Sequence, residues 1–264
     1  MTLPPEMIER ARALRDGRLI PAAPRDAATV VLLRDATGGP QVYLLRRVKA
    51  MAFAAGMHVF PGGSVDTADG AADLAWAGPP GSWWAGVLGA DEPLARALVC
   101  AAVRETFEEC GVLLAGPTAG ELLADVSSDE WEAERVALEA REQSLSELLA
   151  RRRLVLRSDL LRPLAHWVTP ELEPKRFDTR FFLAAMPSGQ VARHVGGEAD
   201  ARVWVRPQDA LDRGLAMMAP TSATLTELAG EADVAAALAV QRTLTPVAPR
   251  FELDGDDELR FVLP

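Results

Sequence analysis

The chain of 264 residues contains only two cysteines, three histidines and one tyrosine. Cys100 and Cys110 lie in a segment typical of a single helix, where a rise of about 1.5 Å per residue separates them by roughly 15 Å, so we expect no disulfide between them. Without a cysteine framework, the sequence favours a reducing compartment, the cytoplasm. The histidines are scattered and lack metal-ligand spacing, which disfavours a histidine-based metal site.

Basic residues are fewer than acidic ones, 28 against 38. The formal net charge is −10, and we therefore expect no nucleic acid and no anionic membrane surface as partner. No run approaches the ~18 apolar residues that a membrane helix needs. A P-loop, a GxGxxG fingerprint and a Ser-His-Asp order are missing, which argues against ATP-driven work, dinucleotide redox chemistry and acyl transfer. A small phosphorylated substrate would need a divalent cation to offset the acidic charge.

The pattern along the chain is that of a mixed α/β domain. Hydrophobic residues make up 49% and charged residues 25% of the sequence, which suffices for a sizeable core. We expect one domain over 1–264, with insertions at about 66–93 and 116–157. Strands are predicted at 28–34, 42–47, 58–60, 164–168, 180–186, 190–194, 202–206 and 259–263, and helices at 6–16, 92–110, 207–215 and 221–238, with one or two amphipathic helices over 119–153.

An acidic trio stands out on the predicted helix 92–110, which is bounded by Pro93 and Gly111. Glu105, Glu108 and Glu109 are spaced i, i+3 and i+4, so their carboxylates share one face and repel one another. A solvated acidic patch is the alternative interpretation, but the trio lies at the C-terminal end of the helix, where the helix dipole does not stabilise carboxylates. Oxygen ligands of this kind are what Mg²⁺ takes, and the trio therefore predicts a metal site.

The segment Arg104-Glu105-Thr106-Phe107-Glu108-Glu109-Cys110-Gly111-Val112, downstream of Pro61-Gly62-Gly63, resembles the split halves of the Nudix box, Gly-x5-Glu-x7-Arg-Glu-U-x-Glu-Glu-x-Gly-U with U apolar. Gly63 matches the first glycine of the box. The sequence departs from the pattern at Asp69, where the box has Glu, at Thr106, where it has an aliphatic residue, and by a long insertion between the halves.

This insertion, together with Trp167-Val168-Thr169-Pro170 and the segment 176–182, is similar to the branch that contains the peroxisomal coenzyme A diphosphatases of the nucleoside diphosphate-linked motif 19 type. The resemblance implies an α/β/α sandwich of the Nudix kind, a mixed sheet between helices. It also implies hydrolysis of a nucleoside diphosphate linked to another moiety, here coenzyme A or acyl-coenzyme A. ADP-ribose, dinucleotides or nucleotide sugars are alternative substrates, and a Nudix-fold binding module without catalysis is the alternative function.

The resemblance further implies roles for single residues. Glu105 and Glu109 would be the main ligands of Mg²⁺, with Mn²⁺ as a substitute, Glu108 a further ligand, and Gly63 a carbonyl ligand. Arg104 would fix the loop or a glutamate by a charge-assisted hydrogen bond, against the alternative of a surface partner of Glu108.

Three further residues are candidates for binding and catalysis. Glu105 itself or Glu198, in a loop before a predicted strand, would take the proton from the attacking water, although Glu198 equally fits an ordinary turn. Arg46 and Arg47 end the second strand on opposite faces, so only one of them can reach a phosphate. The expected partner is a small diphosphate, and the sequence leaves monomer or homodimer open.

Overall fold

The computed structural model describes residues 5–48, 54–71, 74–193, 199–254 and 259–264. Its centre is an eight-stranded sheet with the order β10-β2-β1-β9-β8-β11, in which β3 pairs with β2 and β4 with β1. The β1–β9 and β8–β11 pairs are parallel and the others antiparallel, so the sheet is mixed as predicted. The strands are β1 (Arg25–Arg34), β2 (Gln41–Arg47), β3 (His58–Val59), β4 (Gly62–Ser64), β8 (Leu161–Val168), β9 (Phe177–Ala185), β10 (Ala199–Val205) and β11 (Pro246–Val247).

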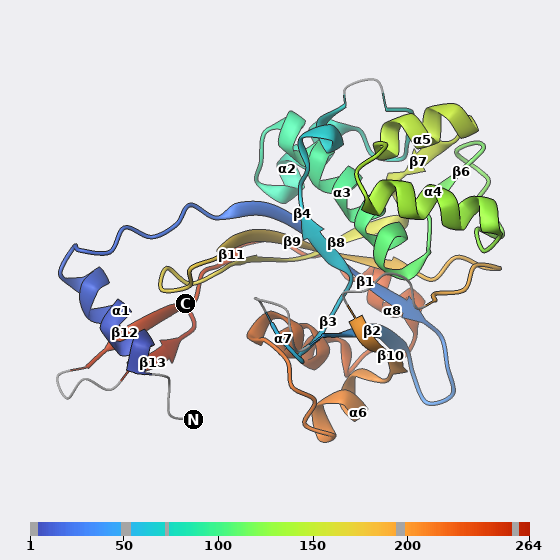
Figure 1. Ribbon diagram of the computed structural model, residues 1–264. Helices are drawn as coiled ribbons and strands as arrows, with labels where there is room; N and C mark the ends of the chain where they lie inside the picture. Colours follow the sequence, from blue (N-terminus) through green and yellow to red (C-terminus); the bar gives the residue numbers. More distant parts are fainter. Residues whose placement is uncertain (1–4, 49–53, 72–73, 194–198, 255–258) are drawn as a thin grey trace.

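Both faces of the central strand β1 are apolar. Val30 and Leu32 belong to the core on one side, whereas Val31 and Leu33 belong to the core on the other. Successive side chains of a strand point to opposite faces, so this run of β-branched and aliphatic residues requires a cover on each side. Helices provide that cover above and below the sheet (Figure 1), which gives the α/β/α sandwich that the sequence predicts.

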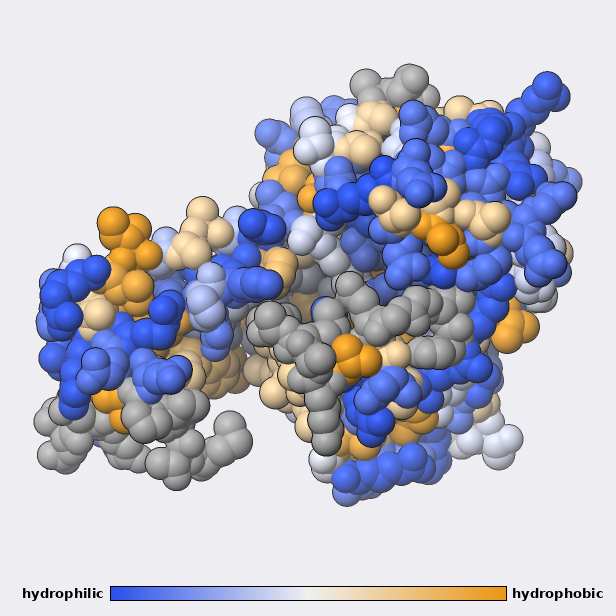
Figure 2. All heavy atoms as spheres, in the orientation of Figure 1, coloured by the Kyte–Doolittle hydropathy of each residue, from blue (hydrophilic) through white to orange (hydrophobic). Residues whose placement is uncertain are grey.

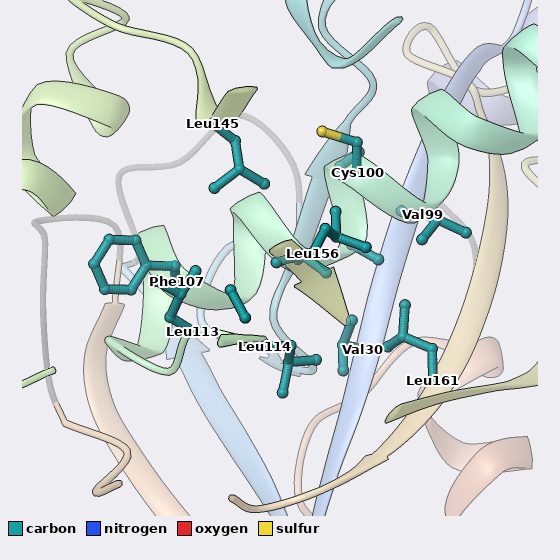
Figure 3. Close-up of a cluster of buried hydrophobic side chains, with 14 of the residues drawn as sticks. Val30, Val99, Cys100, Phe107, Leu113, Leu114, Leu145, Leu156 and Leu161 are labelled. Carbon is teal, nitrogen blue, oxygen red and sulfur yellow. The ribbon is translucent and has the colours of Figure 1, made fainter. Parts of the chain in front are cut away.

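One face is covered by α3 (Glu92–Cys110) and the segments that pack around it. Asp91 caps the first turn by accepting a hydrogen bond from the Leu94 amide, and Gly111 ends the helix with a φ of 65°. Its side chains meet those of β1 and of later segments in one core (Figure 3). The same layer contains α2 (Gly81–Leu88), α4 (Asp129–Glu139), α5 (Leu145–Arg152), the 3-10 turns η1 (Thr67–Gly70) and η2 (Ser158–Leu160), and a small sheet of β5 (Trp76–Ala77), β7 (Val155–Arg157) and β6 (Ala115–Gly116).

The opposite face is covered by three shorter helices, α6 (Pro207–Asp212), α7 (Ala219–Leu228) and α8 (Val234–Ala239). Leu225 and Leu228 of α7 are fully buried and join the core that contains Val31 and Leu33. A single helical stretch over 221–238 was expected here. The structure divides it into α7 and α8, with Gly230 in the connection between them.

The two ends of the chain meet in a small unit beside the sandwich, which we call the terminal unit. It consists of α1 (Pro5–Arg15) and the hairpin of β12 (Arg250–Leu253) and β13 (Leu259–Val262). Figures 1 and 2 show it projecting from one side of the molecule. Its own core is small and contains Ala11, Leu259 and Leu172, the last from the connection between β8 and β9.

One predicted strand is wrong. Residues 190–193 form an irregular segment, and His194 lies outside the described residues. The buried Gln190 side chain explains the difference, because it accepts a hydrogen bond from the Leu113 amide at 2.9 Å and donates to the Leu113 and Leu123 carbonyls. These side-chain bonds anchor the segment without a strand ladder. Over the described ranges, no helix has the length and apolar character needed to cross a membrane.

Candidate active site

The acidic trio lies on the last turns of α3, a helix that packs against β4. Leu98, Ala101, Ala102 and Phe107 are buried on the core side of this helix. The side chains of Glu105 and Glu108 are 13% and 12% exposed, respectively, so they are shielded rather than solvated. The alternative of an acidic patch in bulk solvent is therefore not what the structure shows.

The two halves of the proposed box adjoin at Gly62 and Gly63 of β4. Glu109 Oε2 accepts a hydrogen bond from the Gly62 amide at 2.8 Å. A Cβ atom at Gly63 would lie 2.4 Å from Glu105 Oε1 and 2.6 Å from its Cδ atom. Only a glycine leaves room for a carboxylate this close to the strand. The chain thus seats Glu105 and Glu109 against the backbone of the glycine pair.

Arg104 ties the helix to the loop that follows β4. Its guanidinium donates to both carboxylate oxygens of Asp69, at 2.9 and 3.0 Å, and to the Ser64 carbonyl at 3.0 Å. It also contacts Glu105 Oε1 at 2.8 Å and Glu108 Oε2 at 3.1 Å. Asp69 is buried, and planar bidentate pairs of this kind fix geometry more strongly than a single point charge does. Arg104 therefore connects the helix to the loop after β4, and Glu108 is only one of its four partners.

Charge at this site is only partly compensated. Burial raises the pKa of Glu105 to about 7, against the lowering effect of Arg104, and the neighbouring Glu108 adds to the increase. Burial also raises the pKa of Glu108. For Arg104, burial alone would lower the pKa, but its hydrogen bond to Asp69 and the charges of Glu105 and Glu108 outweigh it, so that pKa is raised. One guanidinium thus contacts Asp69 and also Glu105 and Glu108, the two carboxylates that burial disfavours as anions.

The donor chemistry of the site fits a hard divalent cation. Buried carboxylate oxygens are typical ligands of Mg²⁺, and Glu108 Oε1 is buried with no hydrogen-bond partner among the described residues. Within the described ranges, however, no three histidine, cysteine or acidic side chains are arranged to hold a metal ion. Arg104 contacts both Glu105 and Glu108, while Glu109 accepts a hydrogen bond from the Gly62 amide. The carboxylate oxygens of the trio are thus the type of ligand that a divalent cation prefers.

A cavity of about 850 Å³ opens beside these residues. This volume is within the usual range of ligand sites. Its walls come from β4 and α3, from the turn between α4 and α5, from one face of β1, β8 and β9, from the start of α7, and from the terminal unit. Glu105, Glu108, Glu109, Gly63 and Arg104 all line it.

The other candidate residues are distributed differently. Arg47 lines the cavity, whereas Arg46 pairs with Asp200 at 2.6 Å and is absent from the lining. This is the alternation that neighbouring residues of a strand impose. Glu198 lies outside the described residues. Its role as a base therefore stays a prediction.

Sequence reasoning missed three parts of this site. Asp69 was noted only as a departure from the box, although it accepts the bidentate bond from Arg104. The end of α4 and the turn that follows it contribute the acidic residues Glu139 and Glu142. Trp167 lines the cavity through a strand face that only the sheet register reveals.

No family model matches the chain. The crystal structure of a Nudix hydrolase from Alicyclobacillus acidocaldarius is similar, with a TM-score of 0.73 and 32% sequence identity, and the match covers 84% of this chain and 98% of that one. The acyl-coenzyme A diphosphatase NUDT19 of Gallus gallus is 28% identical over 72% of this chain. The match spans 62% of the length of that relative.

Proposed function

The chain belongs to the Nudix hydrolase family, and from that premise we propose that it hydrolyses a phosphoanhydride bond in a nucleoside diphosphate linked to a second moiety. The observation that carries the proposal is the close approach of Glu105 and Glu109 to the Gly62–Gly63 backbone, beside a cavity of about 850 Å³. A protein that only binds nucleotides has no need of several buried carboxylates that repel one another.

The proposed cofactor is Mg²⁺, with Mn²⁺ as a substitute. Glu105 and Glu109 would hold it, with Glu108 and the Gly63 carbonyl as further ligands. When bound, the cation would neutralise diphosphate oxygens and lower the pKa of a water molecule. The support comes from the unpartnered Glu108 Oε1 and from the raised pKa of Glu105, since both are liabilities that a cation would relieve.

The remaining chemistry falls to protein groups. The proton of the attacking water would pass to Glu105, a shielded carboxylate that lines the cavity. Glu198 is the other candidate for this role. Arg104 would hold Glu105 and Glu108 in place through the hydrogen bonds described above. Arg47, which lines the cavity, would bind a phosphate oxygen.

The proposed substrate is coenzyme A or an acyl-coenzyme A, cut to 3′,5′-ADP and a phosphopantetheine derivative. The similarity to an acyl-coenzyme A diphosphatase supports it, and the cavity volume allows a ligand of that size. ADP-ribose, dinucleotides and nucleotide sugars are the alternatives within the family. The cytoplasm stays the proposed compartment, supported by two buried free cysteines.

The test is an assay of the purified chain with Mg²⁺ or Mn²⁺ over these diphosphates, with identification of the products. Glu105→Gln and Glu109→Gln should each abolish hydrolysis and leave the melting temperature nearly unchanged. Glu130→Gln is the matched control, because the Glu130 side chain is 79% exposed on α4 and does not line the cavity. Wild-type rates in either of the first two variants would refute the assignment of the trio.

A further inference from the structure

The floor of the cavity is one face of the main sheet. The register aligns four lining residues in one row across adjacent strands, Ser64 of β4, Ala27 of β1, Thr179 of β9 and Trp167 of β8. Directly opposed residues in a sheet point to the same face, and neighbouring strands are about 4.8 Å apart. The row therefore extends the floor by about 14 Å, or three strand spacings, from the glycine strand to Trp167.

The chemistry of the lining changes along this floor. At β4 the floor is flanked by Arg104 and by the carboxylates of α3. At β8 and β9 most of the lining residues are apolar, and Trp167, Phe177 and Phe181 among them are aromatic. A diphosphate seated at the carboxylate end would direct one of its substituents over the apolar end.

The terminal unit adds a wall to the apolar end. Phe261 of β13 and Pro249 next to β12 line the cavity, although they follow the rest of the lining by many residues in sequence. The Phe261 ring packs edge-on against Phe251, its cross-strand partner, with 5.3 Å between the ring centroids. Phe251 in turn packs on the small core of the terminal unit, to which Leu172 also belongs. The Phe261 ring is therefore held in place at the cavity by Phe251 and the small core of the terminal unit.

Two charged residues also line this end, Glu173 and Lys175, on the connection between β8 and β9. Their formal charges cancel, so they do not favour a second phosphate over a neutral group. An apolar group, in contrast, would cover the Phe261 side chain, which is 44% exposed, and the 8% of the Trp167 surface that is open to the cavity.

We infer that Trp167 and Phe261 form a subsite for an apolar group that the substrate carries beyond its scissile diphosphate. The terminal unit, through Phe261, is then a determinant of specificity. This inference rests on the proposed function and deepens it. An acyl chain and a nucleobase both present apolar surface, and the experiment separates these two sources.

The experiment measures kcat/KM for two matched substrate pairs. Octanoyl-coenzyme A and coenzyme A differ only in the acyl chain, and ADP-glucose and UDP-glucose differ only in the base. The variants are Phe261→Ala, Phe261→Leu as the conservative replacement, and Leu263→Ala as the control, because Leu263 is an exposed apolar residue of the same terminal segment outside the lining.

We expect Phe261→Ala to reduce the preference within one of the pairs by about tenfold, mainly through KM, because it removes an aromatic ring that is 44% exposed at the cavity and that a bound apolar group would cover. Phe261→Leu should restore most of the preference and Leu263→Ala should retain it. A reduced preference between octanoyl-coenzyme A and coenzyme A would identify the acyl chain as the group in the subsite. A reduced preference between ADP-glucose and UDP-glucose would identify the base. Unchanged preferences in both pairs would overturn the inference.

Binding of the same four compounds to the wild type and to Phe261→Ala, measured by calorimetry without a divalent cation, separates this inference from the proposed function. If the wild type cleaves none of them but Phe261→Ala still removes a binding preference, the subsite stands and the proposed activity fails. If the wild type cleaves them and Phe261→Ala changes neither binding nor kcat/KM ratios, the activity stands and the subsite fails.

Discussion

Replacing Gly63 by alanine tests how the backbone positions Glu105. The added Cβ atom would lie 2.4 Å from Glu105 Oε1, whereas ordinary contacts begin at 3.4 Å, so the carboxylate must retreat by about 1 Å. All three of the closest atoms belong to the end of the Glu105 side chain. The side chain can move without the backbone, and we expect the fold to survive the substitution.

We expect Gly63→Ala to reduce the rate of hydrolysis far more than it changes the stability of the fold. A displacement of about 1 Å in a catalytic constellation costs about 10²-fold in rate. An added methyl group at a glycine stabilises a compatible backbone by about 0.4–1 kcal/mol, because the unfolded chain loses entropy, and this gain offsets part of the clash. We therefore expect kcat/KM to fall about 100-fold while the free energy of unfolding changes by less than about 1 kcal/mol.

The assay compares Gly63→Ala with Gly70→Ala in steady-state hydrolysis and in urea unfolding. Gly70 is the matched control, because a Cβ atom there would meet nothing within 4 Å. Wild-type kcat/KM in Gly63→Ala would refute the reasoning, since Glu105 would then not depend on the space that the glycine leaves.

Three other outcomes follow from the same contacts. In the metal-free protein, burial raises the pKa of Glu105 from 4.5 to about 7. Between these pH values the folded chain binds more protons than the unfolded chain, so the free energy of unfolding, measured with urea, should fall as the pH rises from 4.5 to about 7. Glu105→Gln should weaken this pH dependence. Arg135 is 3% exposed and donates to the Glu108 carbonyl at 2.9 Å, so Arg135→Met should cost about 1–3 kcal/mol in urea unfolding, whereas an unchanged midpoint would contradict that bond. Arg104→Lys loses the bidentate bond to Asp69 and should lower kcat/KM by about 10–100-fold; full activity would show that a point charge suffices.

The helix of the site was predictable because its signals are local. Pro93 at its start and Gly111 at its end mark its bounds, and the observed helix spans Glu92–Cys110. The spacing of the acidic trio then follows from helical periodicity alone. The alternation of Arg46 and Arg47 was also local, but the sequence does not decide which of them faces the cavity.

Long-range contacts account for what was not predicted. The irregular segment at 190–193 depends on hydrogen bonds from Gln190 to Leu113 and Leu123, which are distant in sequence. Trp167 reaches the cavity floor because β8 pairs with β9, and Phe261 because the two ends of the chain pack together. Periodicity describes which face of an element is apolar, but not which partner that face will meet.

The most direct test of the metal assignment is Mn²⁺ binding followed by electron paramagnetic resonance in the wild type, Glu105→Gln, Glu109→Gln and the control Glu130→Gln. The expected result is at least about tenfold weaker binding in the first two variants, with unchanged melting curves, and wild-type affinity in the control. Equal Mn²⁺ affinity in all four proteins would contradict a metal site on the acidic trio of α3.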